Sequence, residues 1–187
     1  MRPTFLRLAL LLGALALAPA ASADDDVDLP INGDFRGAPV GASPAPGWTL
    51  TADGGGARVL PTTDRDDYML ELRATAARPQ SAVTDLHPLA GNVVKLSLKA
   101  SGTGRAAAKV EAFDAARAPV LDHPNMPIAL GEVETKVKSS FTFPPAARFV
   151  RVKLTAEPGA VARFRDVDAE VSGLRVAAVV VPAPAPA

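Results

Sequence analysis

Apolar and polar residues alternate with a period of two in several short segments of the chain. In residues 94–100, Val, Leu, Leu and Ala occupy one set of alternate positions, while Lys95, Ser97 and Lys99 occupy the other. Because successive side chains of a β-strand point to opposite faces, this pattern predicts a strand with one buried and one solvated face. The same alternation recurs in residues 68–73, 108–112, 136–143 and 149–154.

The Ala-rich stretch 105–118 is the one place where composition favours a helix, because Ala is the best helix former. It follows a predicted strand and Ser-Gly-Thr-Gly at 101–104, which is a hairpin-like turn signal. We therefore predict a strand up to Phe113 and a turn over residues 114–119. No segment of the chain predicts a helix convincingly.

A long irregular connection is expected between about residues 117 and 132. It contains Pro119, Pro124 and Pro127, and a proline cannot donate a backbone hydrogen bond within a central strand. Loops of this kind lie at the surface and often carry the function of a sandwich. Many short strands separated by Gly- or Pro-rich turns predict an all-β fold, a sandwich or a barrel.

The two ends of the chain depart from this pattern. Residues 1–23 have the layout of a secretory signal peptide, with two arginines, an apolar run at 8–17 and Ala-Ser-Ala before the expected cleavage. That run is shorter than the roughly 20 residues needed to span a membrane. We predict one domain over 24–176. A stiff Pro/Ala-rich tail over 177–187 is either a spacer or a frayed terminus.

The amino-acid composition restricts the possible cellular compartments and binding partners. The chain has no cysteine, so it gains no disulfides and has no lipid-attachment residue after the apolar run. Removing the two arginines of residues 1–23 from the 20 basic residues leaves 18, against 20 acidic residues. This balance, without a basic stripe, argues against nucleic acid as a partner. We expect a periplasmic or secreted protein that is not inserted in the membrane after cleavage.

Three pieces of the chain, in order, resemble the carbohydrate-binding-module type of galactose-binding-like jelly roll. The first has Asn-Gly-Asp-Phe followed by Gly-Trp, similar to that family's opening strand pair. The second is similar to its central hairpin, and the third, ending in Arg-Phe-Arg-Asp-Val, to its closing strands. The pieces are residues 31–35 with 46–50, 94–102 with 110–114, and 143–152 with 163–167. The resemblance implies a two-sheet antiparallel jelly-roll β-sandwich with a glycan as the ligand class.

Members of that family often bind a structural calcium ion through an acid after the opening motif and an acid of the closing motif. This chain has Arg36 and Arg165 at such positions, while Asp34 and Asp166 remain as candidate metal ligands. Calcium takes six to eight oxygen ligands, and nearby arginines oppose its binding electrostatically. We expect no cofactor, with a structural calcium as the alternative. We hypothesise that Arg36 or Arg165 pairs with Asp166 in place of the ion.

Few aromatic residues are available for a sugar to stack on. Trp48 and Tyr68 are the only residues of their types, and both fall where a core role is expected. His123, one of two histidines, has no second His or Cys at metal-ligand spacing. If the long connection binds a ligand, the candidate ligand-binding residues are Asp122, His123 and Asn125.

Familiar catalytic motifs are absent from the sequence. It contains no Gly-x-Ser-x-Gly, no Cys-His pair and no His-Glu-x-x-His. A glycosidase needs only two carboxylates, but a chain with few aromatic residues offers little for a sugar cleft. The sequence therefore predicts an exported, non-catalytic binding module whose partner is a glycan. The alternative is a structural or interaction module that contacts another protein of the cell envelope.

Overall fold

The computed structural model describes residues 26–41, 45–51, 55–63, 67–121 and 124–173. The predicted signal peptide and the Pro/Ala-rich tail lie outside these residues. In the described part of the chain no helix is long and apolar enough to cross a membrane. The strands are β1 (Val27–Asp28), β2 (Trp48–Leu50), β3 (Gly56–Pro61), β4 (Tyr68–Arg73), β5 (Gln80–Thr84), β6 (His87–Pro88), β7 (Val93–Thr103), β8 (Arg105–Phe113), β9 (Pro119–Leu121), β10 (Met126–Ala129), β11 (Thr135–Thr142), β12 (Phe149–Ala156) and β13 (Val161–Ser172).

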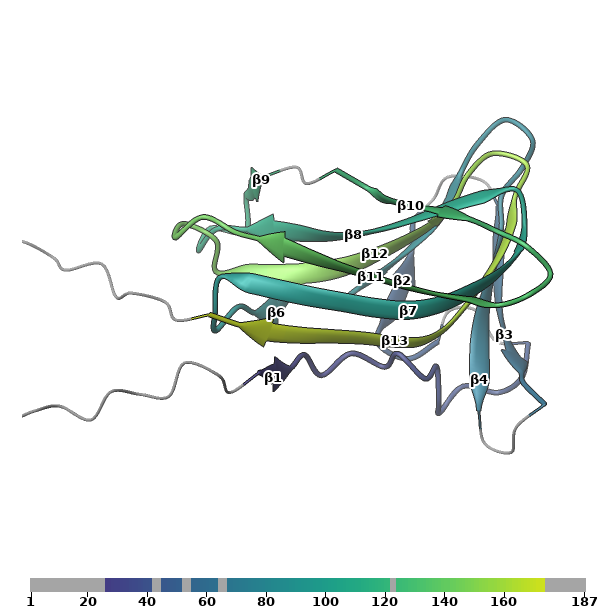
Figure 1. The fold of residues 1–187 in the computed structure, drawn as a ribbon, viewed down its shortest axis with the longest axis horizontal. Helices are drawn as coiled ribbons and strands as arrows, with labels where there is room; N and C mark the ends of the chain where they lie inside the picture. Colours follow the sequence, from purple (N-terminus) through teal and green to yellow (C-terminus); the bar gives the residue numbers. More distant parts are fainter. Residues whose placement is uncertain (1–25, 42–44, 52–54, 64–66, 122–123, 174–187) are drawn as a thin grey trace, which may run out of the picture.

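These strands form two sheets that pack face to face (Figure 1). Sheet A has the order β11-β7-β13-β4-β3, with β1 beside β13. Sheet B has the order β10-β8-β12-β5-β2, with β6 beside β12 and β9 beside β8. Every strand pair in both sheets is antiparallel. The predicted all-β, two-sheet antiparallel jelly-roll sandwich is confirmed.

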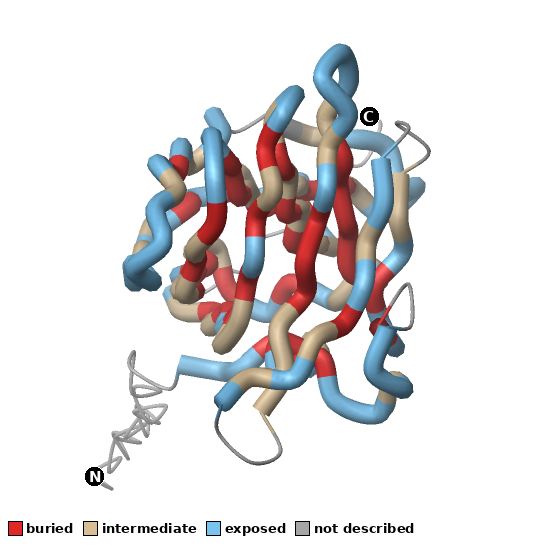
Figure 2. The backbone as a smooth tube through the Cα atoms, turned by 90° about the vertical axis from the view of Figure 1, so that its right-hand side faces the viewer, coloured by how far each residue is buried: buried red, intermediate tan, exposed pale blue. Residues whose placement is uncertain are grey.

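The core between the sheets comes from the alternating segments of the sequence. On β7, Val94, Leu96 and Leu98 are buried, while Lys95 and Lys99 face outward. The Ala-rich stretch is strand β8, which ends at Phe113 as predicted. Figure 2 shows buried segments running along the strands and exposed segments at their connecting turns. With no cysteine in the chain, this apolar layer is what holds the two sheets together.

The turn at residues 101–104 does not form the hairpin that we expected. Strand β7 belongs to sheet A and β8 to sheet B, so the chain crosses between sheets at this point. Gly102 and Gly104 have φ angles of 135° and 86°, which favour glycine. The N–H of Gly102 donates to the carbonyl of Gly131 (2.8 Å), in the connection from β10 to β11. Period-two alternation identifies inward-facing residues but not the sheet to which a strand belongs.

The connection after β8 is more regular than we expected. Strands β9 and β10 both pair with β8, so residues 117–132 contain two short strands. Pro127 lies in β10, opposite Ala107. A proline is compatible with β10 because this strand ends the sheet order and needs donors on one side only.

Residues 31–35 form a turn and not the first strand of a pair. The Asn32 side chain closes this turn: its Oδ1 accepts the Arg36 N–H (3.0 Å), and its Nδ2 donates to the carbonyls of Arg36 and Pro46 (both 2.9 Å). The indole N–H of Trp48 donates to the Asn32 carbonyl (2.8 Å). Trp48 is 3% exposed and lies 5.4 Å, centroid to centroid, from the buried ring of Phe35. The predicted core role of Trp48 is confirmed.

The same turn is fixed to the last strand through Gly33. The Val167 N–H donates to the Gly33 carbonyl (3.2 Å). A Cβ atom on Gly33 would lie 1.6 Å from the Val167 carbonyl oxygen, so only glycine fits here. Val167 lies within a bulge of β13, between Arg165, which pairs with Lys99, and Asp168, which pairs with Ser97. One extra residue is therefore accommodated between these pairs, and Asp166 has a positive φ of 49°.

One carboxylate, Glu71, is fully buried on the outer side of sheet A. Its Oε1 accepts the Nε–H groups of Arg58 (2.8 Å) and Arg73 (2.7 Å), and its Oε2 accepts that of Arg163 (2.9 Å). Burial alone would raise the pKa of Glu71. The hydrogen bonds from Arg163, Arg73 and Arg58 outweigh burial and hold this pKa below its usual range.

Replacing Gly33 with Ala should destabilise the protein, because the new Cβ overlaps the Val167 carbonyl. We expect a loss of about 3 kcal/mol, equivalent to a fall in Tm of about 6–12 °C. Thermal unfolding followed by circular dichroism measures the change. Gly56→Ala is the matched control, because a Cβ there meets no atom within 4 Å. A Gly33→Ala protein as stable as wild type would show that the contact with Val167 is not required.

Glu71→Gln should lower stability at neutral pH by about 2 kcal/mol. This is less than the roughly 3–5 kcal/mol typical of a broken buried pair, because the three arginines are about half exposed. Since the folded-state pKa of Glu71 is lowered, its contribution is fully present above the unfolded-state pKa and is lost as pH falls through the folded-state pKa. In thermal melts from pH 7 to pH 3, the difference in Tm between wild type and variant should therefore become smaller as the pH falls. A constant difference across this range would contradict the lowered pKa.

Candidate functional site

The candidate ligand residues of the long connection are only partly described. Asp122 and His123 lie outside the described residues. Asn125 is exposed and precedes β10 at the edge of sheet B. A binding role for these three residues stays a prediction.

The two candidate metal ligands, Asp34 and Asp166, lie at one depression of about 360 Å³. It is formed by the turn after β1 and the bulge of β13. Its lining includes Asn32, Asp28 and Asp168. The sequence motifs at 31–35 and 163–167, far apart in the chain, therefore do meet in space.

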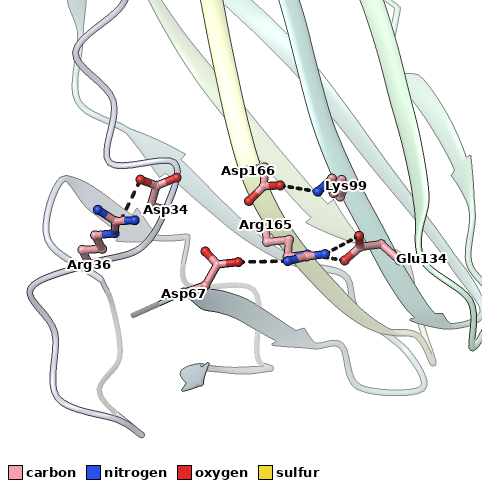
Figure 3. A network of polar contacts seen from close by, with 7 residues as sticks. All are labelled: Asp34, Arg36, Asp67, Lys99, Glu134, Arg165 and Asp166. Atoms are coloured by element: carbon pink, nitrogen blue, oxygen red, sulfur yellow. Dashed lines mark hydrogen bonds and ion pairs between the residues drawn. The ribbon is translucent and has the colours of Figure 1, made fainter. Parts of the chain in front are cut away.

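Each candidate metal ligand has a cation beside it (Figure 3). The Asp166 carboxylate pairs with Lys99 Nζ (2.6 Å), and the Asp34 carboxylate lies 3.6 Å from Arg36 Nε. Both Asp side chains are partly exposed, at 37% and 53%. The direct ion-pair partner of Asp166 is Lys99 from β7, a residue that our hypothesis did not name. Together with the Glu134 hydrogen bonds, the Asp166 charge raises the pKa of Arg165, the preceding residue in the chain.

Arg165 instead joins two other acids. Its Nε and Nη2 donate to the two carboxylate oxygens of Glu134 (2.5 and 2.8 Å), and its Nη1 donates to Asp67 (2.9 Å). The Glu134 hydrogen bonds raise the pKa of Arg165 above its already high value. Arg165 thus connects the start of β11 to the start of β4 across the bulged strand, as Figure 3 shows.

These contacts do not fit a calcium site. Among the described residues, no group of three or more His, Cys, Asp or Glu side chains is placed to hold a metal ion. The Lys99 ammonium lies 2.6 Å from the Asp166 carboxylate, and its charge would repel a bound cation. The ion pairs at the depression therefore argue against calcium binding there.

The outer face of sheet B carries a second polar group, centred on Glu111. Its Oε2 accepts the Arg151 Nε–H (2.7 Å), and its Oε1 lies 3.2 Å from Lys109 Nζ. Glu111 and Arg151 are directly opposite on β8 and β12. Burial would raise the pKa of Glu111, but the hydrogen bonds and charges of Arg151 and Lys109 together outweigh burial and lower it. The Glu111 side chain is only 17% exposed, and the contacts with Arg151 and Lys109 hold its carboxylate in one position.

Two phenyl rings lie next to this group, at the opposed positions Phe113 and Phe149. The Arg151 guanidinium carbon lies 5.0 Å from the Phe113 ring centroid, and that of Arg117 lies 5.9 Å from the Phe149 centroid. Both distances are typical of cation–π contacts. Arg117 has a left-handed φ of 63°, in a turn closed by Asp114 Oδ1.

Further along the same face, β5 and β12 contribute hydroxyl groups. Ser81 Oγ and Thr155 Oγ1 lie 2.9 Å apart. Ser81 is nearly fully buried although it is on the outer side of its strand, opposite Thr155. The face therefore offers a carboxylate, a guanidinium, an ammonium group and the Thr155 hydroxyl, whereas the Ser81 hydroxyl is enclosed. Together these groups can both donate and accept hydrogen bonds.

The sequence contained only part of this information. Alternation in 108–112 and 149–154 placed Lys109, Glu111 and Arg151 on solvent faces. It could not show that β8 and β12 are neighbours, because their pairing joins segments about 40 positions apart in the chain. The contact of Arg117 with Phe149 depends on a left-handed turn residue that no pattern signalled.

The fold is similar to those of solved carbohydrate-binding modules. The family 22 xylan-binding domain CBM22-1 of Paenibacillus barcinonensis Xyn10C matches with a TM-score of 0.51 and 15% identity, over 82% of this chain and 99% of that one. The family 11 module of Clostridium thermocellum Lic26A-Cel5E matches with a TM-score of 0.51 and 10% identity, over 82% and 98%. At these low sequence identities, the structural matches establish likeness of fold alone. No protein-family model and no curated protein sequence matches the chain.

Larger proteins contain the same kind of domain. The enzymatically active domain of bacteriophage CBA120 tailspike protein 4 matches with a TM-score of 0.57 and 15% identity, over 66% of this chain. This chain spans only 19% of that structure. The resemblance to carbohydrate-binding-module jelly rolls noted in the sequence is confirmed at the level of structure.

Calcium should not stabilise this protein, because Lys99 already neutralises Asp166. We expect the same Tm with added calcium and with a chelator, measured by thermal unfolding. Lys99→Gln should cost less than about 1 kcal/mol, since the pair is partly exposed. A calcium-dependent rise in the Tm of wild type would contradict this account of the depression.

Proposed function

We propose that this protein is an exported, non-catalytic glycan-binding module. The observation that carries the proposal is the outer face of sheet B, where Glu111, Arg151 and Lys109 form one fixed polar group. The likeness to solved xylan-binding domains supports a glycan as ligand class. The glycan would lie across β8 and β12.

The chemistry of this face suits sugar hydroxyl groups. A hydroxyl both donates and accepts hydrogen bonds, so it can donate to the Glu111 carboxylate and accept from Arg151 or Lys109. These side chains are positioned by mutual contacts before a ligand arrives, which lowers the entropic cost of binding. Thr155, whose hydroxyl lies 2.9 Å from that of the buried Ser81, extends the same face.

The way in which Glu111 is held supports a non-catalytic role. A general acid must be protonated near neutral pH, whereas Arg151 lowers the pKa of this carboxylate. A retaining or inverting glycosidase also uses two carboxyl groups on either side of the sugar bond. On this face Glu111 is flanked by cations.

A second candidate function is contact with another protein of the cell envelope. The observation that favours it is the state of the two outward phenyl rings. Arg151 lies over Phe113 and Arg117 lies over Phe149, so an arginine competes with a sugar for stacking on each ring. Aromatic and arginine side chains are also enriched at protein–protein interfaces.

A glycan array followed by isothermal titration with each hit tests the proposal. We expect Glu111→Gln to weaken binding at least tenfold, because the amide no longer accepts as a charged group and its contact with Arg151 is lost. Glu170→Gln, on the outer face of sheet A, is the matched control and should bind like wild type. Absence of any polysaccharide ligand, together with an envelope protein that co-purifies, would favour the alternative.

Export is tested separately from binding. We expect the protein expressed in a Gram-negative host to be cleaved after Ala23, so that N-terminal sequencing begins at Asp24. Its presence in the periplasmic or culture fraction would accompany cleavage. An uncleaved chain retained in the cytoplasm would contradict the proposed signal peptide.

A further inference from the structure

The outer face of sheet A holds three arginines around a single acid. Arg58, Glu71 and Arg163 lie opposite one another on the adjacent strands β3, β4 and β13. Arg73 is two residues beyond Glu71 on β4 and faces the same way. The three guanidinium groups all donate through Nε to the one carboxylate, at 2.7–2.9 Å. We call these three arginines and Glu71 the arginine cluster.

The cluster carries two more positive charges than negative ones. Within the described part of the chain, Arg58, Arg73 and Arg163 have no ion pair except with Glu71. Their Nη groups make no hydrogen bond there either. Charges of the same sign held this close repel one another, so the cluster is electrostatically incomplete.

The acid of the arginine cluster is buried, whereas its guanidinium groups are partly exposed. The Glu71 side chain is fully buried, whereas those of Arg58, Arg73 and Arg163 are 46%, 51% and 43% exposed. The carboxylate therefore holds the arginines from below by Nε, while the guanidinium groups reach solvent. A guanidinium group presents its N–H donors in a planar fork that matches carboxylate and phosphate oxygens. The donors are positioned before any ligand binds.

We propose that the arginine cluster is a binding site for an oxyanion group, a sulfate, carboxylate or phosphate. One such group, bound over the three guanidinium groups, would accept hydrogen bonds from Nη and offset the surplus charge. Acidic polysaccharides carry sulfate and carboxylate groups, and inorganic sulfate and phosphate carry the same chemistry in free form. The site is on the opposite sheet from Glu111 and Arg151, so it does not depend on the glycan face of sheet B.

The same face offers a further cationic contact for a polymer. Lys136 and Lys138 of β11 are exposed beside a depression of about 480 Å³, which is also lined by Lys95 and by the acids Asp168 and Glu170. In sheet A, β11 is two strands from β13, which carries Arg163, and four strands from β3, which carries Arg58. Strands are about 4.8 Å apart, so the two groups of cations, the arginines and the lysines of β11, lie roughly 10–19 Å apart across the sheet. An acidic polymer could contact both, whereas a free anion could contact only one.

Isothermal titration at low ionic strength tests the proposal with four probes: dextran sulfate, polygalacturonate, inorganic phosphate and neutral dextran. We expect binding of at least one anionic probe and none of neutral dextran. Tighter binding of the polymers than of phosphate would identify a polysaccharide as the source of the oxyanion. Binding of phosphate alone would identify a free anion. Failure of all three anionic probes would overturn the proposal.

Arg73→Gln should weaken binding of the anionic probe at least fivefold, and added salt should weaken binding to wild type. Arg73→Lys keeps the positive charge but loses the planar fork of N–H donors. The affinity of this variant for the anionic probe should therefore lie between those of wild type and Arg73→Gln. Arg78→Gln is the matched control, because Arg78 is exposed in the turn after β4 and its side chain has no ion pair among the described residues. Equal affinities for wild type and Arg73→Gln would overturn the proposal.

The double variant Arg58→Gln with Arg73→Gln leaves a single pair between Arg163 and Glu71. This pair has no surplus charge, so we expect no measurable anion binding. Near-ultraviolet circular dichroism checks that the variant is folded, and Arg73→Gln carries the test if it is not. Glu111→Gln should leave anion binding unchanged, and Arg73→Gln should leave neutral-glycan binding unchanged. Failure of one site is thereby distinguished from failure of the other.

Discussion

The contact between Gly33 and Val167 is the constraint on which the arrangement of the charged groups depends. It joins the N-terminal turn to the last strand at the position where β13 accommodates one extra residue. Without that bulge, strict alternation would place Phe164 and Val167 on opposite faces. With it, both residues are buried, and Arg165 and Asp166 lie between them at the bulge. This irregularity in the backbone thus places Asp166 beside Lys99 and next to Arg165, which pairs with Glu134 and Asp67.

The faces of the strands were predictable because burial imposes a period of two on the sequence. Residues 94–100 and the end of β8 at Phe113 follow directly from that rule. The connections were not predictable in the same way. The turn at Gly102 and Gly104 has the composition of a hairpin, yet it carries the chain from one sheet to the other. Glycine indicates where the backbone turns, but the direction is set by tertiary contacts such as that of Gly102 with Gly131.

The candidate site shows a related limit. Asp34 and Asp166 could be brought together from the sequence, because the motifs that contain them resemble those of a known fold. The cation beside Asp166 could not be predicted from the sequence. Lys99 belongs to a regular alternating strand, and its sequence context is the same as that of any other solvent-facing lysine. One signal was present: Phe164 and Val167 are three positions apart in a segment where two is expected, a spacing that fits a bulge. The partner on the adjacent strand still depends on register.

The outer faces of the two sheets use charge in the same way. On each, one acid is largely removed from solvent and accepts Nε–H groups from arginine on a neighbouring strand, and on each the pKa of the acid is lowered. The difference lies in number: Glu111 is balanced by Arg151 and Lys109, whereas Glu71 has three arginines. The whole chain has 20 basic and 20 acidic residues, and the balance of charges argued against nucleic acid as a partner. A net count averages over the surface, while a ligand senses charge within about a Debye length, roughly 8–10 Å. Over that distance the arginine cluster is positive, so a neutral chain is compatible with a local site for anions.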